Sequence, residues 1–484
     1  MKLGELIDAA PAAIAEVVVT GVTADSRRVE PGFLFAAVAG AAAHGRDFVA
    51  DAVARGAAAV MSAGDLNADP GVPHLIVQDV RAELAWAAAA FHPGRPDHLV
   101  GVTGTNGKSS TVDFLRQIWA HAGRRAASLG TLGAIWSASD AERRLDLGHT
   151  TADPVQLHRT LTMLAQAGIT HAAMEVSSHG LEQRRVDALA FDAAAFTNLT
   201  QDHLDYHQTM EAYRAAKMRI WAHVRRPGIA VINADSPEAE AFARGAEGLR
   251  VVTAGWRAGG AGLKIAEIAP HPASQTLTLK WKSAEAKVEL PLIGEFQAIN
   301  AVTAAALALA MGEEPHVVYA ALERLKPVKG RMEHVGATAA GAHVFVDYAH
   351  TPDGLNVLLR AARPHAPGRI VLVFGCGGDR DKDKRAKMGA VAAKLADVVI
   401  VTDDNPRTED PAAIRKMILA AAPAAQEIGD RAAAIAAGVE MLRQGDALLI
   451  AGKGHETGQI VGREIIPFSD QSEALKALKE RSHA

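Results

Sequence analysis

The chain has 484 residues, which predicts about three domains at roughly 150 residues each. Hydrophobic residues make up 49% and charged residues 22% of it, and the formal net charge is −4. This composition supplies enough apolar material for several cores, and it excludes binding to nucleic acid or an anionic membrane through a broad basic surface.

The ends and the cysteine content indicate a cytoplasmic protein. The single cysteine, Cys376, excludes an intrachain disulfide and favours a reducing compartment. The first residues lack the basic run and apolar core of a signal peptide. Apolar stretches such as residues 304–310 are too short to span a bilayer.

Short β-branched runs alternate with alanine-rich helical stretches along almost the whole chain, which is typical of α/β domains with largely parallel sheets. These runs lie at residues 98–103, 172–176, 229–233, 370–374, 398–402 and 447–451. Residues 263–292 instead show the alternation of antiparallel strands. Proline and glycine interrupt the pattern at residues 93–96 and 326–331. We therefore predict domains over residues 1–96, 97–330 and 331–484.

The most informative short segment begins at the strand expected from His98. It runs into a glycine-rich turn, then Lys108 and Ser109, then a helical segment. Backbone N–H groups in such a turn and at a helix N-terminus can bind phosphate oxygens. Lys108 would reach the β- and γ-phosphates, and the Ser109 hydroxyl would bind Mg²⁺. Five residues separate Gly101 from Gly107, one more than the strict phosphate-loop pattern, so a plain glycine turn stays an alternative to an ATP or GTP site.

Two further apolar strands end in polar residues, at Glu175 and just before a cluster of acidic and histidine residues. That cluster contains Asp202, His203, Asp205 and His207. The carboxyl ends of parallel strands meet at one edge of a sheet, so Glu175 and His203 are expected near the phosphate loop. A carboxylate with an imidazole suits a divalent cation beside a triphosphate. A lone histidine is more often structural, but the cluster after an apolar strand favours the metal.

Residues 103–109, 175–179 and 198–207 together resemble the Mur ligase family. The resemblance extends over the whole chain in order and is weakest in the first hundred residues. It implies an α/β protein with three domains: an N-terminal UDP-binding domain, a central ATPase-type domain with a mostly parallel sheet, and a C-terminal Rossmann-like domain. It also implies an ATP-dependent, amide-forming ligase of peptidoglycan synthesis, with UDP-N-acetylmuramoyl-L-alanyl-D-glutamate as substrate.

The family resemblance implies ATP as co-substrate and Mg²⁺ as cofactor. The implied ATP contacts are Gly104, Thr105, Asn106, Gly107, Lys108, Ser109, Ser110, Asn300, Arg331 and Asp347. The implied catalytic residues are Lys108, Glu175, His203, Lys217 and Arg331. Mg²⁺ would be held by Ser109, Glu175, His203 and Lys217, the last as a carbamate. Without the family, Lys217 would be interpreted as a solvated helix lysine.

Contacts to the UDP-linked dipeptide are implied from the first two domains. They are Ser26, Thr150, Thr151, Ser178, Gln183 and Arg185. Residues 40–45 depart from the family, because alanines stand at 41–43 where polar contacts to uracil are expected.

The last domain is expected to select the amino acid. Its implied contacts are Arg380, Asp404, Asn405, Pro406, Arg407, Gly452 and Glu456. Residues 404–407 match the motif of family members that add meso-diaminopimelate, whereas members that add L-lysine lack the arginine. The arginine fork can bind the distal carboxylate of meso-diaminopimelate in a bidentate manner, and lysine has no such group.

Three alternatives stay open: an L-lysine-adding ligase, a folylpolyglutamate synthase, and a nucleotide-binding module that has lost its chemistry. Arg407 argues against the first, and Thr150, Thr151 and Ser178 argue against the second. The intact set of catalytic residues argues against the third. We expect a monomer with small-molecule substrates and no nucleic-acid or membrane partner.

Overall fold

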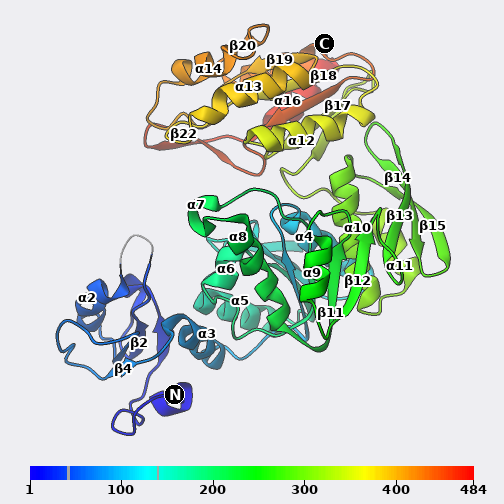
Figure 1. Ribbon diagram of the computed structural model, residues 1–484. Helices are drawn as coiled ribbons and strands as arrows, with labels where there is room; N and C mark the ends of the chain where they lie inside the picture. Colours follow the sequence, from blue (N-terminus) through cyan, green and yellow to red (C-terminus); the bar gives the residue numbers. More distant parts are fainter. Residues whose placement is uncertain (41–43, 139–140, 484) are drawn as a thin grey trace. The chain divides into compact units, whose positions relative to one another are not determined.

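The computed structural model describes residues 1–40, 44–138 and 141–483 (Figure 1). The chain divides into two compact units, one of Met1–Gly262 with Thr303–Glu314 and one of Leu263–Val302 with Pro315–Ala484. The domain boundaries predicted after residues 96 and 330 lie inside these units and stay a prediction. Within the described ranges, no helix combines the length and apolar character needed to cross a membrane.

A small parallel sheet opens the first unit, in the order β1-β2-β3-β4. Its strands are β1 (Gly21–Thr23), β2 (Phe33–Ala36), β3 (Ala59–Ser62) and β4 (His74–Ile76), with helices α1 (Leu3–Leu6), α2 (Val49–Ala54) and α3 (Val80–Phe91). Alternate strand residues face opposite ways: Leu34 belongs to the core that contains Leu84 of α3, and Phe35 to the core that contains Val49 of α2.

The larger sheet of the first unit has the order β12-β11-β10-β5-β9-β6-β7-β8. It is parallel from β12 to β6, and β7 and β8 extend it as antiparallel strands. Its strands are β5 (His98–Thr103), β6 (Ala126–Gly130), β7 (Gly133–Ala138), β8 (Ala141–Leu145), β9 (His171–Glu175), β10 (Phe191–Phe196), β11 (Val224–Asn233) and β12 (Arg250–Gly255). The accompanying helices are α4 (Lys108–His121), α5 (Pro154–Gln166), α6 (Ser178–Glu182), α7 (Leu204–His207), α8 (Met210–Met218) and α9 (Ala239–Gly245).

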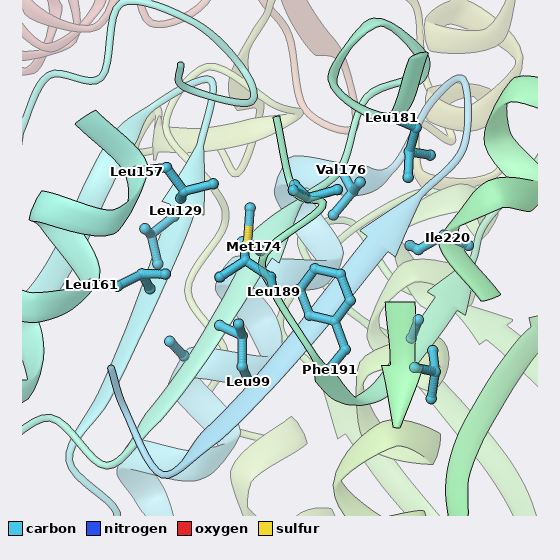
Figure 2. Packing of buried hydrophobic residues seen from close by; sticks show 14 of the residues in the cluster. Leu99, Leu129, Leu157, Leu161, Met174, Val176, Leu181, Leu189, Phe191 and Ile220 are labelled. Atoms are coloured by element: carbon cyan, nitrogen blue, oxygen red, sulfur yellow. The ribbon is translucent and has the colours of Figure 1, made fainter. Parts of the chain in front are cut away.

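Helix α5 shows how the sequence covers this sheet. Asp153 caps its N-terminus by accepting hydrogen bonds from two backbone N–H groups, and Pro154 occupies the first turn, where proline costs no hydrogen bond. Leu157 and Leu161 then pack with Leu129 and Met174 of the sheet, as Figure 2 shows. Helix α4 also packs against β6 and β9. The central strands are therefore almost wholly buried, which explains their continuous apolar runs.

The second unit contains an antiparallel segment and a mostly parallel sheet. The segment consists of β13 (Leu263–Pro270), β14 (Gln275–Trp281) and β15 (Ala284–Leu290), as the alternation of residues 263–292 predicts. The sheet has the order β16-β17-β21-β18-β19-β20, with β16 antiparallel to β17. Its strands are β16 (Glu333–Ala337), β17 (His343–Asp347), β18 (Ile370–Phe374), β19 (Val398–Val401), β20 (Gln426–Glu427) and β21 (Ala447–Ala451), and β22 (Gly458–Val461) pairs with β23 (Glu464–Pro467).

Helices cover both faces of the sheet in the second unit. They are α12 (Pro352–Ala362), α13 (Asp383–Leu395), α14 (Pro411–Leu419), α15 (Arg431–Glu440) and α16 (Asp470–His483), and the unit also contains α11 (Pro315–Leu322) and the first part of α10 (Glu295–Ala310). Leu372 of β18 packs in the core with α12, α13 and α14, whereas Val373 packs in the core with α15 and α16. This doubly wound arrangement confirms the Rossmann-like fold expected for the C-terminal region.

A fully buried ion pair joins two of these helices. The Arg431 side chain at the start of α15 donates to both carboxylate oxygens of Asp470 at the start of α16, at 2.7 and 2.8 Å. Neither side chain is accessible to solvent. Arg431 also donates to the carbonyl of Ala451, the last residue of β21, at 3.0 Å. The pair therefore fixes two helices and the carboxyl end of a strand.

Replacing Asp470 by alanine is expected to lower the free energy of unfolding by about 3–5 kcal/mol, because it leaves the Arg431 charge buried without its partner. Denaturant unfolding followed by circular dichroism measures this change. The double variant Arg431→Met/Asp470→Leu serves as control and should be clearly more stable than Asp470→Ala. An Asp470→Ala variant with the same free energy of unfolding as the wild-type chain would contradict the expectation.

Candidate active site

The phosphate loop lies between β5 and α4 and takes the shape that its glycines permit. Gly104 and Gly107 have φ angles of +150° and +83°, which other residues rarely adopt. The Lys108 ammonium donates to the carbonyls of Gly104 and Thr105, both at 2.8 Å. Ser110 is buried in the first turn of α4. The lysine is thus held over its own loop at the N-terminus of a helix, where phosphate groups bind.

Residues that follow β10 form hydrogen bonds to the phosphate loop. The Thr197 hydroxyl donates to the Asn106 carbonyl at 2.6 Å, and the Asn106 backbone N–H donates to Asn198 Oδ1 at 2.9 Å. The Thr105 hydroxyl lies 3.2 Å from the hydroxyl of Tyr213. A Cβ at position 104 would lie 1.9 Å from the Thr197 hydroxyl oxygen, so the loop fits against its neighbour because residue 104 is glycine.

The carboxyl end of β9 places Glu175 beside the phosphate loop, as its position after a strand predicts. Glu175 Oε1 accepts hydrogen bonds from the Ser109 hydroxyl and the Thr131 backbone N–H, both at 2.8 Å. A Cβ on Gly130 would lie 2.1 Å from the same oxygen. Glu175 and Ser109 therefore present a carboxylate and a hydroxyl oxygen together, the donors that suit Mg²⁺.

His203 lies outside this pair and is half exposed. It precedes α7 with a φ of +53°, its Nε2 lies 3.5 Å from an Asp202 carboxylate oxygen, and its ring packs edge-on against His179. The side chain of Asp205, predicted in the same cluster, lies outside the described residues. Among the residues that are described, no three His, Cys, Asp or Glu side chains form a group that could hold a metal ion.

Lys217 is not the solvated helix lysine that its sequence context alone suggests. It lies on α8 with 1% of its surface exposed. Its ammonium nitrogen donates to the Gly104 carbonyl at 2.8 Å and lies 4.5 Å from the centre of the Tyr213 ring. Burial, and then the nearby charge of Lys108, hold the pKa of Lys217 well below its usual value. The structure therefore places a buried amine with a lowered pKa against the phosphate loop.

Several residues implied for the UDP-linked dipeptide surround Glu175. The hydroxyls of Thr131 and Thr150 are 2.9 Å apart, and Thr131 Oγ1 also donates to Glu175 Oε2 at 3.4 Å. The Thr151 hydroxyl donates to the Glu175 carbonyl at 3.1 Å. Arg185 donates to the Thr151 carbonyl at 2.5 Å and to Gln183 Oε1 at 2.7 Å. These contacts link Thr150 to the Glu175 carboxylate through Thr131, and link Thr151, Arg185 and Gln183 to the Glu175 backbone carbonyl.

Ser178 and Ser26 are the other two residues implied for the UDP-linked dipeptide, and they contact other groups than Glu175. Ser178 is 1% exposed, and its hydroxyl lies 3.0 Å from Nε2 of His207, whose Nδ1 lies 3.1 Å from a carboxylate oxygen of Glu182. Ser26 is buried at the start of a short 3₁₀ helix capped by Asp25. Residues 41–43, where the sequence departs from the family, lie outside the described part of the chain.

The second unit contains the other residues implied for ATP. The Arg331 guanidinium lies 4.8 Å from the centre of the Tyr348 ring, and Asn300 donates to Gln297 at 3.5 Å. The Asp347 carboxylate accepts from the backbone N–H groups of Met332 and Ala349, both at 2.7 Å. Burial raises the pKa of Asp347. In this structure Asp347 therefore fixes the backbone next to Arg331, a role that its position after a strand did not predict.

Several of the residues implied for the amino acid meet at the carboxyl edge of the sheet in the second unit. Asn405 Nδ2 donates to Glu456 Oε2 at 2.9 Å, which joins the segment after β19 to the segment after β21. A Cβ on Gly452, whose φ is +121°, would lie 2.9 Å from a carboxylate oxygen of Asp404. Pro406 is buried and Arg380 is exposed.

Arg407 has an unusual backbone. Its φ is +51°, its N–H donates to the Ile460 carbonyl at 3.0 Å, and its carbonyl accepts from the Gly462 N–H at 2.7 Å. Its guanidinium donates to the Gly378 carbonyl at 2.8 Å. The β22–β23 hairpin therefore holds the residue that is expected to recognise the amino acid.

Lys453 is a residue that the sequence reasoning missed. It is fully buried and donates to Asn405 Oδ1 at 2.8 Å. Its place between Gly452 and Gly454, directly after a buried strand, was the available signal. A lysine at a strand end is ordinarily solvated, so the signal is weak without the structure.

Comparisons with known proteins agree with this geometry. Family models match three regions: the Mur ligase family, catalytic domain at residues 18–96, the Mur ligase middle domain at 102–308, and the Mur ligase, glutamate ligase domain at 330–454. A UDP-N-acetylmuramoyl-L-alanyl-D-glutamate–2,6-diaminopimelate ligase of Caulobacter vibrioides is 49% identical over 96% of both chains. A ligase of the same name from Rhizobium meliloti is 51% identical over 96% of this chain and 95% of that one.

Solved structures of Mur ligases are similar to this chain as well. A structure with that ligase name is 32% identical and superposes with a TM-score of 0.76 over 100% of both chains. The MurF ligase from Thermotoga maritima in complex with ADP, 19% identical, shares the fold with a TM-score of 0.64 over 96% of this chain and 99% of that one. By matches that span its length and by identity of about half its residues to full-length relatives, the chain belongs to the Mur ligase family.

Proposed function

We propose that this protein is an ATP-dependent ligase that joins meso-2,6-diaminopimelate to the γ-carboxylate of D-glutamate in UDP-N-acetylmuramoyl-L-alanyl-D-glutamate during peptidoglycan synthesis. Relatives at 49% and 51% identity over nearly their full lengths are named as ligases of UDP-N-acetylmuramoyl-L-alanyl-D-glutamate and 2,6-diaminopimelate. The choice of meso-diaminopimelate rests on the position of Arg407. Two backbone hydrogen bonds hold this arginine at the edge of the sheet where Asn405 and Glu456 meet.

The proposed reaction has two steps. A carboxylate is a poor electrophile, so an oxygen of the D-glutamate γ-carboxylate first attacks the γ-phosphorus of ATP, which gives an acyl phosphate and ADP. The amine of meso-diaminopimelate then attacks the acyl carbon, loses a proton, and phosphate leaves as the amide forms. Lys108 would exchange its two loop carbonyls for phosphate oxygens and offset their charge.

We propose Mg²⁺ as the cofactor, held by Ser109, Glu175, His203 and a carbamate on Lys217. The hydroxyl and carboxylate oxygens of Ser109 and Glu175, 2.8 Å apart beside the phosphate loop, fit this cation. Bound Mg²⁺ would neutralise phosphate charge and orient the γ-phosphate. His203 lies in the segment between β10 and α7 and would supply an imidazole nitrogen.

The family resemblance implies the carbamate, and the burial of Lys217 supports it. A carbamate forms when a neutral amine attacks CO₂ and loses a proton, and an ordinary lysine is almost fully protonated near neutral pH. The burial that lowers the pKa of Lys217 therefore favours the reacting form. The product is an anion next to the phosphate loop, where a second cation-binding oxygen would be useful.

We further propose that the reaction takes place in the cytoplasm, where ATP is supplied, and that the protein works as a monomer. In the described residues, the phosphate loop, Glu175 and Lys217 all come from one compact unit of one chain. The proposed substrates are small molecules, so the reaction needs no macromolecular partner.

The primary test is phosphate release from ATP with Mg²⁺ and UDP-N-acetylmuramoyl-L-alanyl-D-glutamate, measured with meso-diaminopimelate, with L-lysine and with no amino acid. Release that depends on meso-diaminopimelate is expected. Release with L-lysine alone would keep the ligase class and overturn the choice of amino acid. The absence of release with either amino acid would overturn the ligase and favour a folylpolyglutamate synthase or a non-catalytic module.

Replacing Arg407 by alanine is expected to raise the KM for meso-diaminopimelate at least about 30-fold, because truncating one partner of a buried charge pair typically costs about 2–5 kcal/mol. The KM values for ATP and the UDP-linked dipeptide should change little. Arg360→Ala on α12, whose side chain bonds to Asn356, is the matched control. Equal kinetics of the Arg407 variant and wild type would argue against arginine recognition of the distal carboxylate.

Replacing Lys217 by alanine is expected to reduce kcat to near background, and added short-chain carboxylates should restore part of it by supplying the missing oxygens. Wild-type protein in ¹³C-labelled bicarbonate should show a carbamate resonance that the variant lacks. Lys382→Ala, at an exposed lysine, is the control. No recovery together with no resonance in the wild type would contradict the carbamate.

A further inference from the structure

We propose that Lys453 is the positioning residue of the amino-acid pocket: its buried ammonium fixes Asn405 and Glu456, and it leaves the cluster with one negative charge for the ammonium group of the incoming amino acid. This inference rests on the proposed function and extends it to a residue outside the predicted binding set. It is carried by the contacts of Lys453 within the second unit.

Three oxygen atoms surround the Lys453 ammonium nitrogen. Asn405 Oδ1 lies at 2.8 Å, Glu456 Oε2 at 3.4 Å and Asp404 Oδ1 at 3.6 Å. The Lys453 side chain has no accessible surface, whereas 34% of the Glu456 side chain is exposed. The lysine therefore lies beneath the cluster and cannot contact a ligand, but the glutamate can.

The lysine determines which way the Asn405 amide points. Asn405 Oδ1 accepts from Lys453 and from the Ile460 backbone N–H at 2.9 Å, and its Nδ2 donates to Glu456 at 2.9 Å. A flipped amide would direct its NH₂ group at two donors and its oxygen at a carboxylate. Lys453 thereby keeps an Asn405 N–H on Glu456 and holds both side chains in one arrangement.

The charges of the cluster do not cancel. The Asp404 and Glu456 carboxylates face the single ammonium of Lys453, and the neighbouring Arg431 is already matched by Asp470. Within this set of three groups, which leaves out the Arg407 guanidinium proposed for the distal carboxylate, the carboxylates exceed the ammonium by one charge. The amino acids proposed as substrates carry ammonium groups, and the exposed carboxylate of Glu456 is where one can bind.

The first experiment measures steady-state kinetics of Lys453→Met with each substrate varied in turn. The KM for meso-diaminopimelate should rise about 30-fold or more, while the KM values for ATP and the UDP-linked dipeptide stay within about threefold. Lys394→Met, at an exposed lysine on α13, is the matched control and should behave as wild type. Lys453→Gln keeps an uncharged NH₂ donor group, should give an intermediate KM, and serves if the methionine variant does not fold.

A double-variant cycle separates positioning from a general structural effect. If Lys453 acts through Asn405, then Lys453→Met/Asn405→Ala should raise the KM for meso-diaminopimelate little beyond the worse single variant. Fully additive effects, an unchanged or lower KM, or equal increases for all three substrates would each overturn the proposal. A wild-type protein without meso-diaminopimelate-dependent phosphate release would instead refute the proposed function.

Discussion

The direction of the strands is the constraint on which both candidate sites depend. In a parallel sheet all strands end at the same edge, and backbone groups and side chains that follow them meet there. In the first unit this edge brings together the loop after β5, Glu175 of β9 and Thr197 after β10. In the second unit it brings together Gly378, Asn405 and Glu456. One topological rule thus assembles both the residues proposed to bind phosphate and those proposed to bind the amino acid.

The two edges also share a buried lysine, Lys217 in the first unit and Lys453 in the second. The groups that surround the two lysines differ. Lys217 contacts a carbonyl oxygen and an aromatic face, and its burial lowers the pKa of its amine. Lys453 lies among carboxylate and amide oxygens that stabilise an ammonium. The same residue type therefore has a lowered pKa at one edge and close oxygen partners at the other.

Sequence patterns predicted the features that depend on the order of strands and helices along the chain. The alternation of strands and helices, the phosphate loop, and the meeting of Ser109 with Glu175 all follow from strand polarity and short spacing. Patterns could not predict that Lys217 is buried, because this depends on α8 packing Tyr213 against a loop more than a hundred residues earlier. The hydrogen bonds of Asp347 to two backbone N–H groups and the place of Lys453 beneath Glu456 likewise arise from tertiary contacts between distant segments.

The left-handed backbone of Arg407 has a consequence for the evolution of new specificities. An L-residue in this conformation is tolerated because the β22–β23 hairpin supplies two hydrogen bonds that compensate for its strain. Asparagine or glycine could occupy the position readily, but a β-branched residue could not. If Arg407 selects the amino acid as proposed, a change of preference through this position is confined to a few replacements unless the hairpin changes as well. Transplanting the loop and hairpin together is the workable route for engineering a ligase with a new side-chain choice.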